Sequence, residues 1–92
     1  MSRRAVMVRV DGRVQGVGFR YWARQAAEAL GLCGWVRNEP DGSVAALLAG
    51  PAEAVEEMLE RLRQGPRGAV VTGVAAEPAA HDAAPEDFRI VR

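Results

Sequence analysis

The sequence contains no lysine, one cysteine and one histidine. A lone cysteine excludes a disulfide within the chain, and one cysteine with one histidine leaves too few nitrogen and sulfur ligands for a zinc site. All basic side chains are arginines, and the 12 basic and 12 acidic side chains give a formal net charge of +0. A neutral chain lacks a long-range attraction for nucleic acid or membrane surfaces. The sequence therefore predicts no metal site, no nucleic-acid partner and no membrane partner.

Long apolar runs are also absent. No stretch approaches the roughly 20 apolar residues that cross a bilayer, and residues 5–11 alternate instead of forming the apolar region of a signal peptide. A cytoplasmic location is therefore expected. Apolar residues make up 49% of the chain, the proportion of an ordinary globular protein. A chain of 92 residues can bury one modest core, so we expect residues 1–92 to form a single domain.

The apolar pattern predicts alternating strands and helices. Val6, Val8 and Val10 share one face of a first strand, and later segments show the three-to-four spacing of helices. In chain order we expect strand, helix, strand, strand, helix, strand and a short final strand at residues 5–11, 21–30, 32–39, 43–49, 51–64, 69–75 and 88–91. Residues 77–86 have no period and are expected to form a loop.

This element order is typical of an α+β, ferredoxin-like βαββαβ sandwich with two helices on one face of an antiparallel sheet, here with a short extra C-terminal strand. In that topology the first two strands run parallel, with the third between them. Their C-terminal ends meet at the same edge of the sheet. The segment after residue 11 and Asn38 should therefore lie roughly 10 Å apart.

Between the first strand and the first helix lies Gly12-Arg13-Val14-Gln15-Gly16-Val17-Gly18-Phe19-Arg20, which we call the glycine loop. Glycines allow a close backbone approach, and the start of a helix presents free N–H groups to an anion. Arg20 adds a planar fork of donors suited to phosphate or carboxylate oxygens. Each feature alone has an ordinary alternative: turn glycines, a salt-bridge arginine, and Asn38 as a turn residue before Pro40.

The chemistry that these residues allow is narrow. No serine, cysteine or histidine lies beside the glycine loop as a nucleophile, and no carboxylate pair is available for two-metal work. The amide of Asn38 can accept a hydrogen bond from a water molecule and donate one as well. A site of this kind suits direct attack of water on an activated phosphate, by positioning and charge stabilisation.

Two segments resemble the two signatures of the acylphosphatase family. The glycine loop resembles the first, and the second is Gly34-Trp35-Val36-Arg37-Asn38-Glu39-Pro40-Asp41-Gly42-Ser43-Val44. Both occur in the right order and spacing, and the resemblance covers nearly the whole chain, fading at residues 77–86. Two matched motifs with a matching element order are far more specific than one glycine-rich loop. The departures are small: Gly18 at a variable position, which should loosen the loop, and Ala45 at an outward-facing position.

The resemblance implies hydrolysis of acyl phosphates, small-molecule carboxyl–phosphate anhydrides, to a carboxylate and inorganic phosphate. Arg20 and Asn38 would be the catalytic residues: Arg20 would bind the phosphoryl group, and Asn38 would orient the attacking water. Arg20 would act with the backbone amides of Val14, Gln15, Gly16, Val17, Gly18 and Phe19. The family needs no metal or other cofactor, and a monomer is expected.

Two alternatives remain open at the level of sequence. Acylphosphatase-like domains also occur within larger carbamoyl-transfer proteins, so the chain could be a non-hydrolytic module that binds phosphate or carbamoyl phosphate, or that serves in maturation. RNA-recognition modules share the same element order, but they need aromatic residues on the central strands and a basic field. The strand expected at residues 43–49 contains no aromatic residue, so the RNA-binding alternative ranks last.

Overall fold

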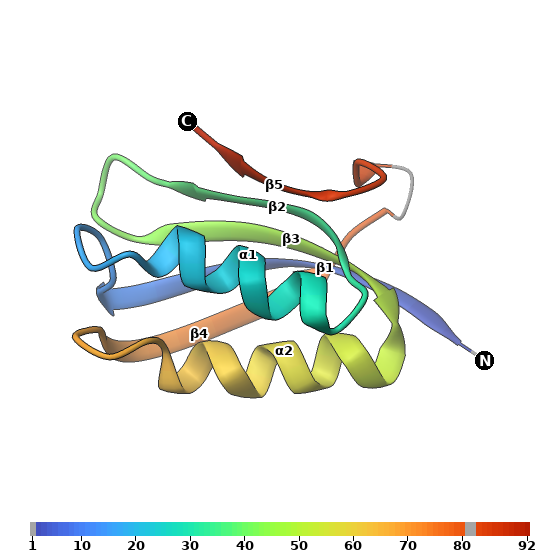
Figure 1. Ribbon diagram of the computed structural model, residues 1–92, viewed down its shortest axis with the longest axis horizontal. Coiled ribbons are helices and arrows are strands. Elements are labelled where there is room, and N and C mark those ends of the chain that lie inside the picture. Colours follow the sequence, from blue (N-terminus) through green and yellow to red (C-terminus); the bar gives the residue numbers. More distant parts are fainter. Residues whose placement is uncertain (1, 81–82) are drawn as a thin grey trace.

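The computed structural model describes residues 2–80 and 83–92. Its elements are β1 (Arg3–Arg13), α1 (Phe19–Ala29), β2 (Cys33–Asn38), β3 (Val44–Pro51), α2 (Ala52–Gln64), β4 (Val70–Pro78) and β5 (Phe88–Val91). The strands form one sheet in the order β4-β1-β3-β2-β5, and both helices cover the same face of it (Figure 1). The predicted ferredoxin-like fold is confirmed. His81, which we expect to be solvated, lies outside the described residues.

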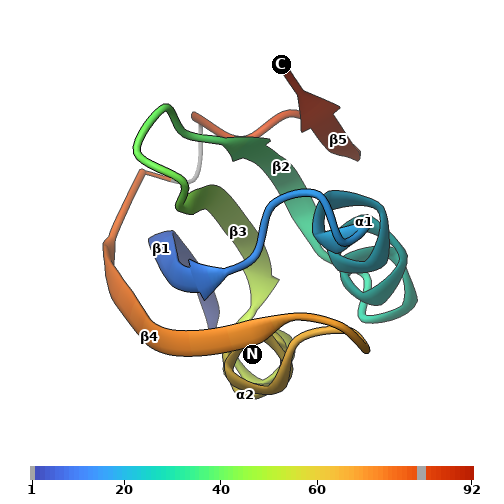
Figure 2. The same ribbon diagram turned by 90° about the vertical axis from the view of Figure 1, so that its left-hand side faces the viewer.

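The sheet is antiparallel over its first four strands, as predicted. β1 pairs with β3 and β4, and β2 pairs with β3, all in antiparallel register. β5 joins the other side of β2 in parallel, which makes the complete sheet mixed. β4 and β5 are consecutive in the chain but lie at opposite edges of the sheet (Figure 2).

Several predicted boundaries are wrong by a few residues. β1 continues through a bulge at Asp11 and Gly12, and α1 begins two residues early, at Phe19. Pro51 ends β3 and caps α2 from outside, instead of occupying its first helical position. The predicted loop at residues 77–86 begins too early, because Pro78 and the residue before it still pair with β1. Pairing with a long neighbouring strand extends β4 where local composition indicates no structure.

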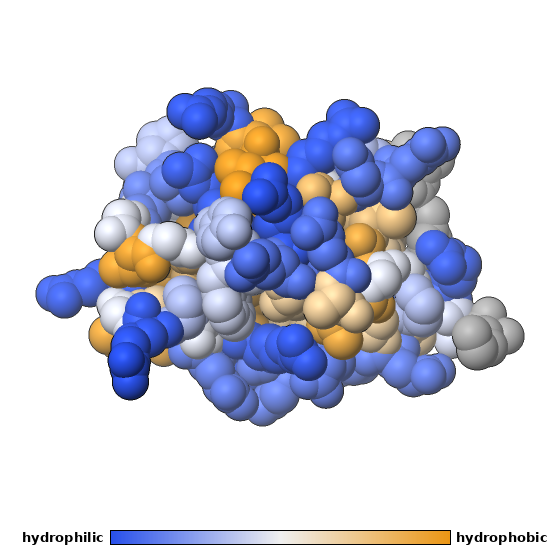
Figure 3. Space-filling view, viewed as in Figure 1, coloured by the Kyte–Doolittle hydropathy of each residue, from blue (hydrophilic) through white to orange (hydrophobic). Residues whose placement is uncertain are grey.

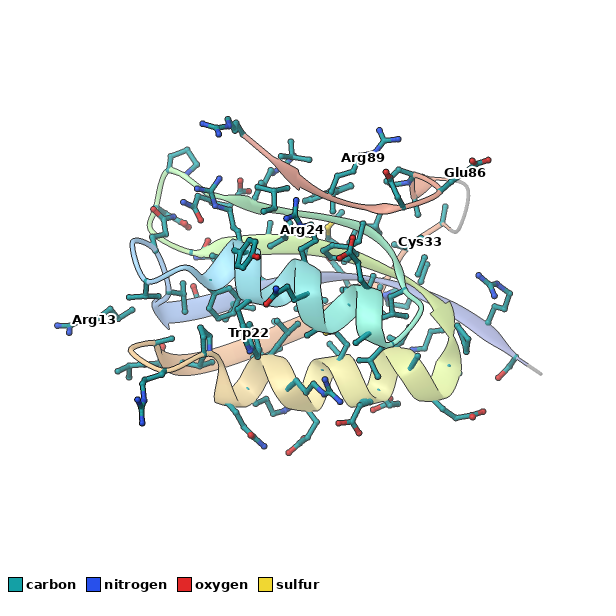
Figure 4. The ribbon with its side chains drawn as sticks, in the orientation of Figure 1. Arg13, Trp22, Arg24, Cys33, Glu86 and Arg89 are labelled. Carbon is teal, nitrogen blue, oxygen red and sulfur yellow. The ribbon has the colours of Figure 1, made fainter. Side chains whose placement is uncertain are left out.

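The core lies between the sheet and the helices. The valines that alternate along β1 are 0–2% exposed, as the sequence pattern predicts. One face of α2 is buried as well, and it consists of the apolar residues Val55, Met58, Leu59 and Leu62. Trp22 projects from α1 (Figure 4), is partly buried, and packs edge-on against Phe19 with 5.3 Å between ring centroids. The outer surface of the helix layer is mostly hydrophilic (Figure 3). Among the described residues, no helix is long and apolar enough to cross a membrane.

The C-terminal ends of β1 and β2 meet at one edge of the sheet, as predicted. The glycine loop crosses from β1 to α1 there, and the β2–β3 turn lies at the same edge (Figures 1 and 2). The parallel course of these two strands follows from their antiparallel pairing with β3, which lies between them. This edge is where the loop and Asn38 can share a site.

Candidate active site

A pocket of about 260 Å³ opens at this edge of the sheet. It combines the glycine loop, the first turn of α1, the end of β2 and the end of the chain. Its lining residues are Val14, Gly16, Gly18, Phe19, Arg20, Tyr21, Asn38, Ile90 and Arg92. The structure therefore brings Arg20 and Asn38 together with most of the loop residues that the sequence predicts for the site.

A larger groove, of about 450 Å³, lies on the sheet face that the helices leave open. Its two arginines are already engaged: Arg9 lies 3.0 Å from Asp11 and 2.7 Å from Asp41, and Arg37 lies 3.0 Å from Glu39. Such paired guanidinium groups offer little free charge to an anionic ligand. The smaller pocket is therefore the better candidate for phosphate chemistry.

The start of α1 supplies backbone donors to this pocket. The first helical bond runs from the N–H of Trp22 to the carbonyl of Gly18 at 3.0 Å. The N–H groups of Phe19, Arg20 and Tyr21 precede it, and such groups have no partner within a helix. Gly18 has no side chain to cap them, and the first turn carries no acidic residue. The free N–H groups and the positive end of the helix dipole therefore favour an anion in the pocket.

Gly18 adopts the left-handed conformation that directs the loop into α1. Its φ is 76°, a value that residues with a side chain rarely adopt. A Cβ built there would meet nothing within 4 Å, so the backbone angle alone favours glycine. The glycine that departs from the family pattern is thus also the N-cap of the helix.

Arg20 lines the pocket from the first turn of α1 and is partly buried. Within residues 2–80 and 83–92 it forms no ion pair, whereas five other arginines do. Those five are Arg4, Arg9, Arg37, Arg61 and Arg89. The alternative that Arg20 is a salt-bridge residue therefore has no support in the described structure, and its guanidinium is available to a ligand.

Asn38 is the last residue of β2 and pairs with Val44 of β3. Side chains two residues apart on a strand point to the same face, and Val36, which is 0% exposed, faces the helices. Asn38 therefore points to the helix side, where α1 begins, whereas Arg37 points to the open face. Alternation along the strand places the amide, and not the neighbouring guanidinium, in the pocket.

Gln15 and Val17 are predicted site residues that do not line the pocket. Val17 packs against the core. The side chain of Gln15 turns to the β2–β3 turn, where its Nε2 donates to the carbonyls of Glu39 and Ser43, both at 2.8 Å. For these two residues only the backbone amide remains a candidate for phosphate binding.

Three pocket residues are missed by the sequence reasoning. Tyr21 directly follows Arg20, and its place in the first helical turn was a usable signal. Ile90 and Arg92 enter the pocket because β5 pairs with β2, its parallel neighbour. Nothing in the local sequence indicates which strand β5 joins.

The β2–β3 turn that follows Asn38 is held by charged hydrogen bonds. Asp41 accepts from the Ser43 hydroxyl at 2.6 Å and from the Ser43 N–H at 3.0 Å. These two bonds, with the nearby charge of Arg9, lower the pKa of Asp41 below its ordinary value of 3.8. In turn, the pKa of Arg9 is raised, first by its hydrogen bond to Asp11 and the negative charge of that residue, and then by the negative charge of Asp41. Hydrogen bonds between Asp41 and Ser43 thus hold the turn that follows Asn38.

The chemistry of the pocket is that of an oxyanion site. Its lining combines the first turn of α1, the guanidinium of Arg20 and the neutral amide of Asn38. Within the described part of the chain, no three His, Cys, Asp or Glu side chains are grouped to hold a metal ion. Fold and pocket together define a small ferredoxin-like α+β protein with an anion site where a strand, a loop and a helix N-terminus meet.

Comparison with known proteins gives the family. Residues 6–90 match the acylphosphatase family. An acylphosphatase of Mesorhizobium japonicum is 62% identical over 89 residues, covering 97% of this chain and 95% of the relative. The acylphosphatase structure from Bacillus subtilis is 35% identical, with a TM-score of 0.92, and the match covers 99% of this chain and 100% of that one. The chain belongs to the acylphosphatase family.

The chain is thus an enzyme that hydrolyses acyl phosphates to carboxylates and inorganic phosphate. The fold is also found within larger proteins. HypF from T. kodakarensis is 26% identical with a TM-score of 0.85, and the match covers 97% of this chain but 12% of that one.

Proposed function

We propose that water attacks the phosphorus of the acyl phosphate directly in the pocket formed by the glycine loop and Asn38. One observation carries the proposal: Arg20, Asn38 and the free N–H groups of α1 converge on one pocket. Arg20 and the backbone amides of residues 14–19 hold the phosphoryl oxygens. Asn38 holds the attacking water on the opposite side of the phosphorus.

The reaction needs positioning more than acid–base chemistry. The water oxygen forms a bond to phosphorus while the bond from phosphorus to the carboxyl oxygen breaks, and the carboxylate leaves with the electron pair. A carboxylate is a stable leaving group, so no general acid is required. One proton of the water stays on the attacking oxygen, and the other passes to a phosphoryl oxygen, so that both end on the phosphate product. Donors that already point at the phosphoryl oxygens stabilise their charge in the transition state without reorganisation.

Direct attack is favoured over a phospho-enzyme by what surrounds the pocket. Among the described residues, its lining includes no serine, cysteine or histidine, and the one hydroxyl there, that of Tyr21, has no histidine or carboxylate side chain in the lining to take its proton. The amide of Asn38 accepts a hydrogen bond from the attacking water through its oxygen. It can therefore orient the water's lone pair toward phosphorus without taking a proton.

The test is hydrolysis of benzoyl phosphate, followed by ultraviolet absorbance in the presence of a chelator. Wild type should turn over with the chelator present. Asn38→Ala should lose about 100-fold or more in kcat, because the water is no longer oriented, while inorganic phosphate still inhibits at a similar concentration. Arg20→Ala should lose both rate and phosphate affinity.

Arg13→Ala is the matched control for Arg20→Ala. Arg13 belongs to the same glycine loop but points away from the molecule (Figure 4). Its removal should therefore leave kcat and the inhibition constant of phosphate near their wild-type values. An Asn38→Ala variant with wild-type kcat would refute the role of Asn38. Phosphate binding without turnover by wild type would instead indicate the non-hydrolytic module.

A further inference from the structure

The Gln15 side chain connects the glycine loop to the β2–β3 turn. Its Nε2 group donates to the carbonyl of Glu39 at 2.8 Å and to the carbonyl of Ser43 at 2.8 Å. The side chain is partly buried, and the residues it joins are 24 and 28 positions away along the chain. Both hydrogens of one amide group are thus used to bridge two segments of the site.

The two carbonyls already take part in the turn itself. The carbonyl of Glu39 accepts from the N–H of Gly42 at 3.1 Å, and that of Ser43 accepts from the N–H of Glu39 at 2.9 Å. Each carbonyl oxygen has two lone pairs, so the amide of Gln15 completes both acceptors. The amide nitrogen must face this pair, because the amide oxygen would meet two acceptors and be repelled.

The positions of the connected residues relate this bridge to the pocket. Gln15 lies between Val14 and Gly16, which both line the pocket, and Glu39 directly follows Asn38. Within residues 2–80 and 83–92, the two bonds from Gln15 are the hydrogen bonds that join loop residues 12–20 to turn residues 39–43. The bridge therefore ties the glycine loop directly to the turn that follows Asn38, in addition to the pairing of β1 and β2 with β3.

We propose that Gln15 is a positioning residue of the reaction, acting through Asn38. This inference rests on the proposed function, in which the loop holds the phosphoryl group and Asn38 holds the water. In-line attack requires these two groups to keep a fixed separation, and an error of about 1 Å in such a site can cost about 100-fold in rate. The bridge supplies that rigidity, while the Gln15 side chain never touches the substrate.

The first test is Gln15→Met, which keeps the length of the side chain and removes both donors. Its kcat for benzoyl phosphate should fall by about 10-fold to 100-fold, while the inhibition constant of inorganic phosphate stays within about twofold of wild type. Gln64→Met is the matched control, because Gln64 is exposed at the end of α2 and should show no change. A wild-type kcat in Gln15→Met would overturn the proposal.

A double-mutant cycle separates positioning from general damage. If Gln15 acts through Asn38, Gln15→Met should cost little further rate in an Asn38→Ala background. Equal losses in both backgrounds would show that the effect does not pass through Asn38, and would refute the inference.

Gln15→Glu provides an independent variant should Gln15→Met fold poorly. A carboxylate facing two carbonyls is repelled, which raises the pKa of the introduced glutamate, and only its protonated form can donate a hydrogen bond. The protonated form has one O–H and can donate to one of the two carbonyls, so its kcat relative to wild type should recover in part as the pH falls from about 7 to about 5. A flat ratio of the two pH profiles would contradict the bridge.

The unaltered protein offers a test that needs no activity. The side-chain amide protons of Gln15 should exchange with solvent more slowly than those of Gln64, because both protons of the Gln15 amide are hydrogen-bonded. NMR measures the two exchange rates. Equal exchange would show that the bridge does not form. Slow exchange in a wild-type protein that does not hydrolyse benzoyl phosphate would leave the bridge intact and place the failure in the proposed function.

Discussion

At the scale of single residues, the arginines of this chain are alike in sequence and differ in their surroundings. Arg13 and Arg20 both belong to the glycine loop, yet Arg13 points away from the molecule and Arg20 lines the pocket. Arg37 directly precedes Asn38, but strand alternation places it on the opposite face, in an ion pair with Glu39. The free charge at the site therefore depends on orientation and pairing, which composition does not reveal.

Gly18 provides the prediction at the residue scale. Gly18→Ala should lower the free energy of unfolding by about 1–2 kcal/mol, because alanine resists the left-handed conformation required there. It should also weaken inhibition by phosphate, since the loop amides and the start of α1 would shift. Urea unfolding and inhibition by phosphate measure the two effects.

Gly68→Ala is the control for this prediction. Gly68 also has a positive φ, of 91°, with nothing within 4 Å of an added Cβ, but it lies between α2 and β4 and outside the pocket lining. This variant should lose stability to a similar extent and keep its phosphate affinity. If Gly18→Ala were as stable as wild type, the conformational argument would be wrong.

At the scale of elements, the site depends on where β1 and β2 end and where α1 begins. β1 and β2 run parallel on either side of β3 and deliver the loop and Asn38 to one edge. α1 begins at that edge without a side-chain cap, which leaves its N–H groups for a ligand. The β2–β3 turn directly follows Asn38 and is held by hydrogen bonds among Asp41, Ser43 and Arg9.

The turn leads to a prediction on pH. Because the pKa of Asp41 is lowered in the folded state, its ionised form contributes stability above the ordinary value of 3.8, and that contribution is lost as the pH falls through the lowered pKa. The urea midpoint of wild type should therefore fall more steeply between about pH 6 and pH 2 than that of Asp41→Asn.

Ser43→Ala removes the largest cause of that lowered pKa. Its urea midpoint should depend on pH less than that of wild type, although the carboxylate is retained. Parallel curves for wild type and both variants would show that the turn does not stabilise the ionised carboxylate.

At the scale of the whole molecule, the anion site should couple to global stability. The pocket draws on β2, α1, β5 and the glycine loop, so unfolding destroys it. A ligand that binds only the folded chain stabilises it by RT ln(1 + [L]/Kd). Phosphate at tenfold above its dissociation constant should therefore add about 1.4 kcal/mol.

The corresponding measurement is thermal unfolding with and without phosphate, at constant ionic strength. Wild type and Asn38→Ala should both gain several degrees in Tm, because neither lacks the phosphate-binding groups. Arg20→Ala should gain little. An equal gain in Arg20→Ala would show that phosphate stabilises the protein elsewhere.

The sequence by itself determined the element order, the buried valine face of β1, the buried stripe of α2 and the junction where loop and helix meet. These features are local: alternation, helical spacing and glycine act within a few residues of where they occur. The arrangement of β1 and β2 was also predictable, because a short hairpin makes β2 and β3 antiparallel and the βαββαβ order places β3 between β1 and β2. The sequence alone therefore places Arg20 and Asn38 at one edge of the sheet.

Only the tertiary structure decided the rest. It shows that Pro78 and Glu77 extend β4, that β5 brings Ile90 and Arg92 to the pocket, and that Gln15 turns away from the pocket to bridge the loop and the turn. Each of these depends on a partner distant in the chain. The free energy gained when a strand pairs, or when a carbonyl accepts a second hydrogen bond, depends on the group that lies opposite. A local sequence pattern does not indicate which distant residue provides that group.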